Sequence, residues 1–344
     1  MDTAPYLCVA ANTGAVLAAL LAAHTISPGG ERCHMALVAI SSYGIIPNVT
    51  ILISGLTGLL TPYHATATTI LIALTFLTIR HLGSRKGSAT PSAQRLPSRS
   101  DNDRLRSLAL SLLAGAFGLQ LMHAAFDATV LKWDVLSYHA AVTAQWLVDE
   151  RISIPPSTYQ AYYPFSSELL SLWFMLPFGD DAYASLAALY WLLLASTAIF
   201  GIIRSTGGSA STALLIAAVF VASPRVTELS RSFSSNDLVG ASLILAAMAV
   251  AIPAAAHRYC QPCLVWSGLL IGMAVGSKVT FVLPGAVVFA WLMLRSPRMT
   301  PGEKYWSSLV SILAPAVLIG GYWYARNWVL TGNPIFPAEI GPLP

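Results

Sequence analysis

Residues 107–126 read SLALSLLAGAFGLQLMHAAF, and a short distance on the chain continues with Lys132-Trp-Asp-Val-Leu-Ser-Tyr-His139. The first stretch is long enough to cross a bilayer, since about 20 mostly apolar helical residues suffice. Asp134, Tyr138 and His139 therefore fall where a transmembrane helix reaches the membrane surface. A carboxylate and an imidazole at that depth are costly unless they are paired or functional. The combination predicts a helical membrane protein with its chemistry at one membrane surface.

The composition supports a membrane protein over the whole length. Of 344 residues, 56% are hydrophobic and only 10% are charged, with a mean hydropathy of +0.65. A soluble domain carries roughly 25% charged residues, so this composition excludes an ordinary soluble protein. The four cysteines are too few and too scattered for a disulfide framework. Cys260-Gln-Pro-Cys263 has redox or metal spacing, but no second pair or histidine cluster accompanies it, so we expect a structural role.

Apolar runs predict an all-α polytopic membrane protein with about ten transmembrane helices and short interfacial helices in the first long outer loop. The runs lie at 7–26, 35–60, 63–82, 107–127, 182–203, 209–223, 236–256, 263–277, 279–295 and 306–324. The last two runs before 300 meet at Lys278 and could form one re-entrant unit. We divide the chain into extra N-terminal helices at 1–82, a basic linker at 83–106 and a membrane core at 107–344.

Lys and Arg set the predicted orientation, because loops rich in them stay on the cytoplasmic side. The Ser-, Pro- and Arg-rich linker 83–106 is typical of a flexible cytoplasmic segment. Ten spans then leave both termini outside, with 13 Lys/Arg and 4 Asp/Glu inside against 6 and 11 outside. The outer face receives a set of polar residues at span ends: Asp134, Tyr138, His139, Glu168, Asp237, Lys278 and Arg326. We expect a multi-pass protein of the cell (plasma or inner) membrane with its site on the outer face.

The longest outer connection, 128–166, is rich in aromatic residues rather than linker-like. The spacing over 138–149 predicts a short helix lying on the bilayer, which Pro155-Pro156 should break. A second short helix is expected at 166–178. The aromatic residues also fit a plain interfacial belt. Glu168, in the first turn of the second helix, either complements the helix dipole or supplies a second carboxylate to a site.

Three further polar residues lie at the outer ends of later spans. Asp237 opens a span, where it suits the positive end of the helix dipole. Lys278 interrupts two apolar runs, so it must find a counter-charge, reach water or bind an anion. Arg326 ends the last span on the outer side, against the usual bias for basic residues. Its guanidinium matches phosphate oxygens, which makes it a candidate phosphate ligand.

A series of motifs occurs in one order along the chain: Asp134-Val-Leu-Ser-Tyr138-His139, Trp146, Tyr163-Pro164, Glu168, Asn236-Asp237, Gly276-Ser-Lys278, Arg326-Asn327 and Gly332-Asn-Pro-Ile-Phe-Pro337. Together they resemble the bacterial multi-pass glycosyltransferases of the GT-C fold, related to the protein mannosyltransferases and aminoarabinose transferases. The resemblance covers roughly 107–337 and leaves the first three spans outside.

The resemblance implies an enzyme that moves a sugar from a polyprenyl-phosphate carrier to an acceptor at the outer face. Asp134 would be the general base on the acceptor hydroxyl, and Lys278 and Arg326 would bind the donor phosphate. Residues implied to bind substrate are Tyr138, His139, Tyr163, Glu168, Asp237 and Asn327. The expected partners are the lipid-linked donor, an unidentified acceptor (protein, lipid or glycan) and membrane lipids, without nucleic acid. No cofactor is expected, although His139 beside the carboxylate leaves a divalent metal ion open.

Other functions stay open. Members of the resembled family run well past the end of this chain, so it reads as a C-terminally truncated core, and an inactive scaffold is one alternative. Broken helices with charges at membrane level would also suit a transporter or lipid flippase. Against transport, the charges gather at one face rather than at the midplane, and we find no internal repeat.

Overall fold

The computed structural model of the chain describes residues 3–26, 32–84, 102–126, 133–156, 158–233, 235–255, 260–295 and 303–339. These parts are helical, and no β-strand occurs within them. The helices are α1 (Ala4–Ile26), α2 (Arg32–Leu56), α3 (Pro62–Ser84), α4 (Asp103–Phe126), η1 (Val135–His139), α5 (Ala140–Asp149), η2 (Tyr159–Tyr162), α6 (Glu168–Met175), α7 (Leu186–Ser205), α8 (Ala210–Ala222), α9 (Pro224–Ser230), α10 (Asn236–Ala255), α11 (Gln261–Ser277), η3 (Val279–Phe281), α12 (Val282–Arg295) and α13 (Glu303–Thr331). The all-α prediction is confirmed, and the apolar helices indicate a membrane-embedded protein.

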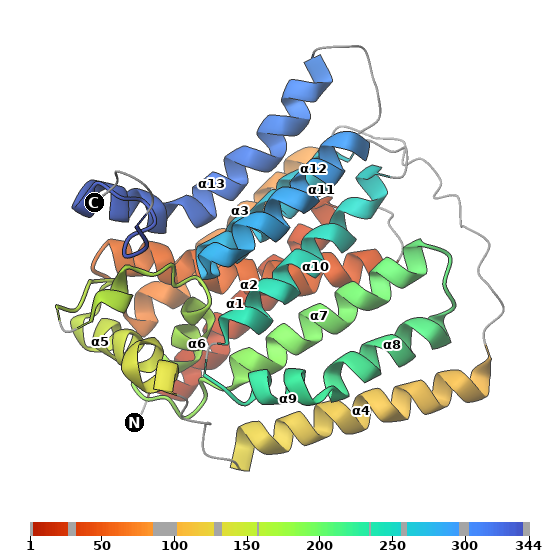
Figure 1. The fold of residues 1–344 in the computed structure, drawn as a ribbon, viewed down its shortest axis with the longest axis horizontal. Coiled ribbons are helices and arrows are strands. Elements are labelled where there is room, and N and C mark those ends of the chain that lie inside the picture. The colour runs from red at the N-terminus through yellow and green to blue at the C-terminus, as the bar shows by residue number, and fades with distance from the viewer. Residues whose placement is uncertain are drawn as a thin grey trace.

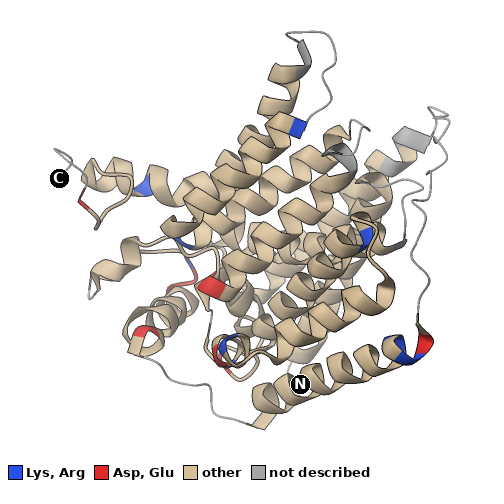
Figure 2. Cartoon of the chain, turned by 45° about the vertical axis from the view of Figure 1, so that its right-hand side comes forward, with Lys and Arg blue, Asp and Glu red and all other residues tan. Residues whose placement is uncertain are grey.

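The long helices lie side by side in one bundle, and the short helices α5 and α6 gather at one of its ends (Figure 1). We call this the site end. α1 begins there, since Leu7 and Trp173 of α6 line one pocket. α13 finishes there, since Asn327 donates to the Tyr162 carbonyl oxygen. Charged residues lie mainly at the bundle ends, with long uncharged stretches of helix between them (Figure 2).

Six helices in the described part of the chain are long and apolar enough to cross a membrane. They are α1, α2, α3, α4, α7 and α13. The α8–α9 pair, bent by 62°, adds a seventh if it forms one crossing. The prediction of about ten spans is therefore not confirmed. The shortfall lies in three shorter apolar segments, Asn236–Ile252, Gln261–Ser277 and Val279–Arg295.

The last two of these segments are short because the chain leaves the helix at Lys278. This residue takes an extended conformation, with φ −163° and ψ 134°. A single 3-10 turn, η3, follows before α12 begins at Val282. At a rise of 1.5 Å per residue, the 14 residues of α12 span about 21 Å. That length is below the hydrocarbon thickness of about 30 Å.

Glycines recur at every fourth position of α11, and they let α13 approach closely. They are Gly268, Gly272 and Gly276. A Cβ on Gly272 would lie 2.3 Å from the carbonyl oxygen of Ala316, and one on Gly320 would lie 2.1 Å from that of Gly272. Small residues allow the backbones of membrane helices to meet in this way. The crossing holds the site ends of α11 and α13 in a fixed relation.

α5 ends at Asp149, before the proline pair that was expected to break it. Glu150 takes a left-handed conformation (φ 51°) and turns the chain toward α2. The Leu60 N–H donates to the Glu150 carbonyl oxygen, and the Ile152 N–H donates to that of Gly55, both at 2.9 Å. Pairing with the end of α2 therefore decides where α5 stops. The N-terminal helices also share one apolar core with the later helices.

Two of the four cysteines are joined. Cys260 and Cys263 form a disulfide at the start of α11, at the opposite end from the site end. Neither Cys8 nor Cys33 takes part in a disulfide. The bond closes a single turn rather than linking distant segments, so it does not make a framework.

Candidate functional site

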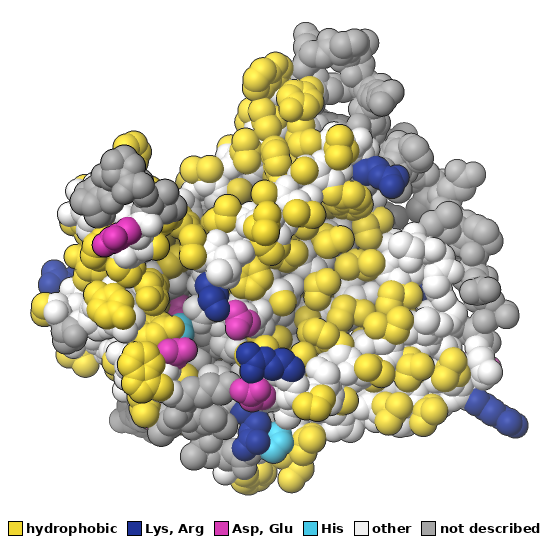
Figure 3. Space-filling view, in the orientation of Figure 1, with side chains coloured by type: hydrophobic (Ala, Val, Ile, Leu, Met, Phe, Trp, Pro, Cys, Tyr) yellow, Lys and Arg dark blue, Asp and Glu magenta, His cyan; other side chains and the backbone are white. Residues whose placement is uncertain are grey.

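Stretches that lie far apart in sequence meet at the site end. The Ser166 N–H donates to the Gly276 carbonyl oxygen at 2.9 Å, and Trp323 Nε1 donates to Ser166 Oγ at 2.9 Å. Asn236 Nδ2 donates to the Ser277 carbonyl oxygen at 3.3 Å. These bonds join the start of α6 to the ends of α11 and α13, and the start of α10 to the end of α11. Figure 3 shows acidic, basic and histidine side chains gathered between apolar surfaces at this end.

Asp134 stands at the start of a π-helical turn and is exposed. The turn covers Val135–His139 and is closed by a bond from the Ala140 N–H to the Val135 carbonyl oxygen. Single π-turns are found frequently at functional sites. The Asp134 carboxylate does not cap the helix. Its side chain is exposed at the surface of the site end.

Tyr138 and Tyr163 form an aromatic wall beside this carboxylate. Their ring centroids are 5.6 Å apart in an edge-to-face arrangement. Burial, and after it the negative charges of Asp134 and Glu168, raise the pKa of Tyr138 well above its ordinary value of 10. Burial, followed by Tyr159 and Asp134, raises the pKa of Tyr163. Both hydroxyls therefore stay protonated near neutral pH, where they can donate hydrogen bonds.

Lys278 finds its counter-charge in Asp237. The Nζ to Oδ1 distance is 2.7 Å, and the two side chains are 41% and 48% exposed. An ion pair this exposed contributes about 0–1 kcal/mol. An incoming anion can thus compete with Asp237 for the ammonium at little cost. The role of Lys278 in phosphate binding stays a prediction.

Arg326 is half-buried near the end of α13, over the ring of Trp323 at 5.1 Å. Its Nη2 donates to Asn327 Oδ1 at 3.0 Å and to the Tyr163 carbonyl oxygen at 3.4 Å. Its Nη1 is buried and has no hydrogen-bond partner among the residues described. A buried donor left without an acceptor costs about 1–3 kcal/mol. This nitrogen is therefore suited to an anionic oxygen of a ligand.

Asn327 was predicted to touch substrate, but the fold already uses its amide. It is 2% exposed. Its Nδ2 donates to the carbonyl oxygens of Tyr162 at 2.7 Å and Phe336 at 3.2 Å, and its Oδ1 accepts from Arg326. Asn327 therefore positions Arg326 and ties the C-terminal turn to η2. The C-terminal Gly-Asn-Pro motif accordingly lies at the site end.

Glu168 is fully buried, and its partner is His139. Oε1 is hydrogen-bonded to His139 Nδ1, and Oε2 accepts from Ser167 Oγ at 2.7 Å. The Glu168 side chain turns toward the π-turn, and its role as a second carboxylate of a site stays a prediction. Within the described residues, no group of three or more His, Cys, Asp or Glu side chains is placed to hold a metal ion.

Two structural members of the site were not singled out from sequence. Ser166 bridges α11 and α13, and no pattern around it signalled this. Trp323 lies on Arg326 and stacks on Trp146, with centroids 6.1 Å apart and planes 15° apart. The aromatic residues just before Arg326 were a signal for Trp323.

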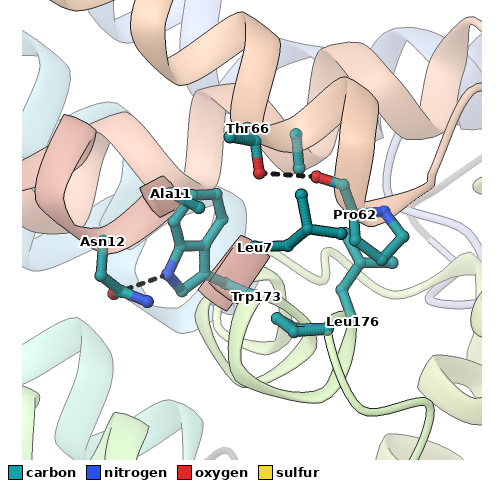
Figure 4. Close-up of a pocket in the computed structure, with 9 residues that line it drawn as sticks. Leu7, Ala11, Asn12, Pro62, Thr66, Trp173 and Leu176 are labelled. Atoms are coloured by element: carbon teal, nitrogen blue, oxygen red, sulfur yellow. Dashed lines mark hydrogen bonds between the residues drawn. The ribbon is translucent and has the colours of Figure 1, made fainter. Parts of the chain in front are cut away.

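A separate small pocket lies between the starts of α1 and α3 and the end of α6 (Figure 4). Its lining is mostly apolar, with Leu7, Pro62 and Leu176 among its residues. Asn12 accepts a hydrogen bond from Trp173 Nε1 there at 3.2 Å. None of the predicted site residues lines it.

Comparison with known proteins finds no matching family model, no matching curated protein and no matching solved structure.

Proposed function

We propose that the chain is a membrane glycosyltransferase that moves a sugar from a polyprenyl-phosphate carrier to an acceptor, with Asp134 as the general base. The arrangement around Tyr163 carries this proposal. The charge of Asp134 acts on the Tyr163 hydroxyl, and Arg326 donates to the Tyr163 carbonyl oxygen. An exposed carboxylate and an arginine whose Nη1 has no partner among the described residues thus share one neighbour at the end of an apolar bundle. A lipid-linked phosphate would meet the protein at such a level.

The chemistry needs one base and one anion site. Asp134 takes the proton of the acceptor hydroxyl, whose oxygen attacks the anomeric carbon. The bond between that carbon and the phosphate oxygen breaks, and the lipid phosphate leaves with the electron pair. Arg326 Nη1 stabilises the negative charge on the leaving phosphate. Lys278 adds to this stabilisation when its ammonium leaves Asp237 and binds the phosphate. Because phosphate leaves as an anion, no acid is needed to protonate it.

The remaining polar groups suit recognition of a sugar. Tyr138 and Tyr163 offer protonated hydroxyls, and Asp237 offers acceptor oxygens once Lys278 has turned to the phosphate. Sugar hydroxyls need donors and acceptors of this kind. His139 and Glu168 stand behind Tyr138, whose ring lies 4.1 Å from that of His139.

The charge distribution supports an outer-face site. Acidic residues dominate the site end, whereas the helix ends carrying Arg104, Arg106, Arg204 and Arg295 lie at the other. Basic segments are retained on the cytoplasmic side. We therefore propose that the site end faces out of the cell, across the plasma or inner membrane.

The test is turnover of purified protein in nanodiscs with a panel of radiolabelled polyprenyl-phosphate sugars. We expect release or transfer of one sugar by the wild type and by Asp181→Asn, an exposed carboxylate at the same end. Asp134→Asn should lose about 10²–10⁴-fold in kcat. Equal turnover by both variants would remove Asp134 from the mechanism. Flux of intact donor across sealed vesicles, without sugar release, would favour a flippase instead.

A further inference from the structure

Cys260-Gln-Pro-Cys263 is a motif that the proposed transfer reaction does not use. Its two cysteines form a disulfide at the start of α11, at the end of the bundle opposite the site end. Cys260 is half-buried, whereas Cys263 is 1% exposed. An incoming reagent therefore meets one accessible residue of the pair and one that the core covers.

A purely structural role, which the sequence alone favoured, explains this disulfide poorly. A disulfide stabilises a fold mainly by restricting the unfolded chain, and the effect is smallest for short loops. The two cysteines here are only three positions apart. Other contacts already hold the start of α11, since Gln261 Nε2 donates to Ser311 Oγ of α13 at 3.3 Å and Cys263 packs in the main apolar core. The bond can therefore open without unfolding the helix.

The position of Cys260 suits a reactive sulfur. Cys260 is the N-cap residue of α11, and its Sγ accepts a hydrogen bond from the Cys263 N–H at 3.3 Å. An N–H donor and the positive end of the helix dipole both favour a negatively charged sulfur. The thiolate is the form of cysteine that attacks and leaves in disulfide exchange. Once the bond opens, the start of α11 therefore keeps Cys260 reactive.

The orientation under Proposed function places this end of the bundle in the cytoplasm, together with Arg204 at the end of α7 and Arg295 at the end of α12. Cytoplasmic thiols are kept reduced, and the disulfides that form there are usually transient, either catalytic or redox-sensing. A disulfide on this side is therefore expected to open and close. This expectation depends on the proposed orientation, whereas the contacts of Cys260 do not.

We propose that Cys260 and Cys263 are a reversible thiol–disulfide couple that reacts with external thiols through Cys260. An external thiolate attacks Cys260 Sγ, the bond to Cys263 breaks, and Cys263 leaves as a thiolate that takes up a proton. A second external thiolate attacks the external sulfur of the mixed disulfide and releases Cys260 as a thiolate. Two external thiols are thereby oxidised to one disulfide, and their two electrons reduce the Cys260–Cys263 bond.

The first test counts thiols in the full-length protein carrying Cys8→Ser and Cys33→Ser, in which the pair supplies the only cysteines. Folded protein in detergent is equilibrated with reduced and then with oxidised glutathione, and maleimide-polyethylene glycol added before denaturation reports each free thiol as a gel shift. We expect two thiols in reduced glutathione, none in oxidised glutathione, and both again after a second reduction. Structural disulfides resist glutathione, so thiols that appear only after unfolding in SDS would overturn the proposal.

The second test asks which sulfur reacts. In the same background, Cys263→Ser leaves Cys260 at the N-cap, and Cys260→Ser leaves Cys263 in the core as a matched control. We expect Cys260 to form a mixed disulfide with oxidised glutathione about tenfold or more faster than Cys263 does. Equal rates would overturn the assignment of Cys260. Neither test involves a sugar donor or a sealed membrane, so failure of the transfer reaction or of the orientation would leave both expected results unchanged.

Discussion

Replacing Gly272 by alanine should loosen the crossing that sets the geometry of the site. The new Cβ would lie 2.3 Å from the Ala316 carbonyl oxygen, about 1.1 Å inside the 3.4 Å at which ordinary contact begins. It would also lie 2.7 Å from both Ala316 Cα and Ile319 Cγ2. Two of these three atoms belong to the backbone and cannot rotate away, so α11 and α13 must separate.

The magnitude follows from two opposing effects. Overpacking costs about 1–3 kcal/mol, and three simultaneous clashes favour the upper half of that range. Alanine recovers about 0.5–1 kcal/mol over glycine within a helix. The net loss for Gly272→Ala is therefore about 2 kcal/mol. Gly115 of α4 supplies a matched control, since its Cβ would meet nothing within 4 Å. Gly115→Ala should be as stable as wild type or slightly more stable.

The assay is equilibrium unfolding in mixed micelles by SDS titration, followed by tryptophan fluorescence. Wild type, Gly272→Ala and Gly115→Ala are compared under one condition. We expect the two variants to differ by about 2–3 kcal/mol, in favour of Gly115→Ala. A Gly272→Ala protein as stable as Gly115→Ala would refute the close crossing of α11 and α13.

Three further predictions use the same unfolding assay or a binding titration. Asn327→Ala should lose about 2–4 kcal/mol, because two carbonyl oxygens and Arg326 lose their partner; a neutral result would contradict the tie to the C-terminal turn. The raised pKa of Tyr138 contributes stability that is full below pH 10 and is lost as pH rises through the raised value, so Tyr138→Phe should flatten the alkaline fall in stability. Asp237→Asn should lower the free energy of unfolding by less than about 1 kcal/mol. It should also strengthen the binding of polyprenyl phosphate, since Asp237 no longer competes for the Lys278 ammonium; weaker binding would count against an exchange of Asp237 for phosphate.

The helical architecture could be predicted because apolar length is a local signal, and rare polar residues marked the positions of the candidate site. The polar residues picked out along 134–327 lie at the site end. The number of spans was not predictable in the same way. Lys278 was recognised as an interruption, but sequence does not tell how far α12 would run after it, and its 14 residues fall short of a crossing.

Contacts between side chains far apart in the sequence could not be predicted, for a physical reason. His139 contacts Glu168 from the end of a π-turn, and a local sequence pattern gives no sign of such a turn or of its partner 29 residues on. The end of α5 at Asp149 agrees with the helical spacing predicted over 138–149, whereas the backbone pairing of the following residues with Gly55 and Leu60 had no sequence signal. Arg326 was recognised by charge, whereas its single open nitrogen depends on Asn327 and Tyr163 occupying the others.

The most direct measurement is the affinity of the purified protein for polyprenyl phosphate in wild type, Arg326→Gln and Arg151→Gln. Arg151 is exposed and lies outside the site, so its variant controls for the lost charge. A hydrogen bond to a charged group is worth about 1.5–3 kcal/mol, so we expect binding by Arg326→Gln to weaken about 10- to 150-fold, while Arg151→Gln binds like wild type. Equal affinity in all three proteins would contradict a lipid-phosphate site at the end of α13.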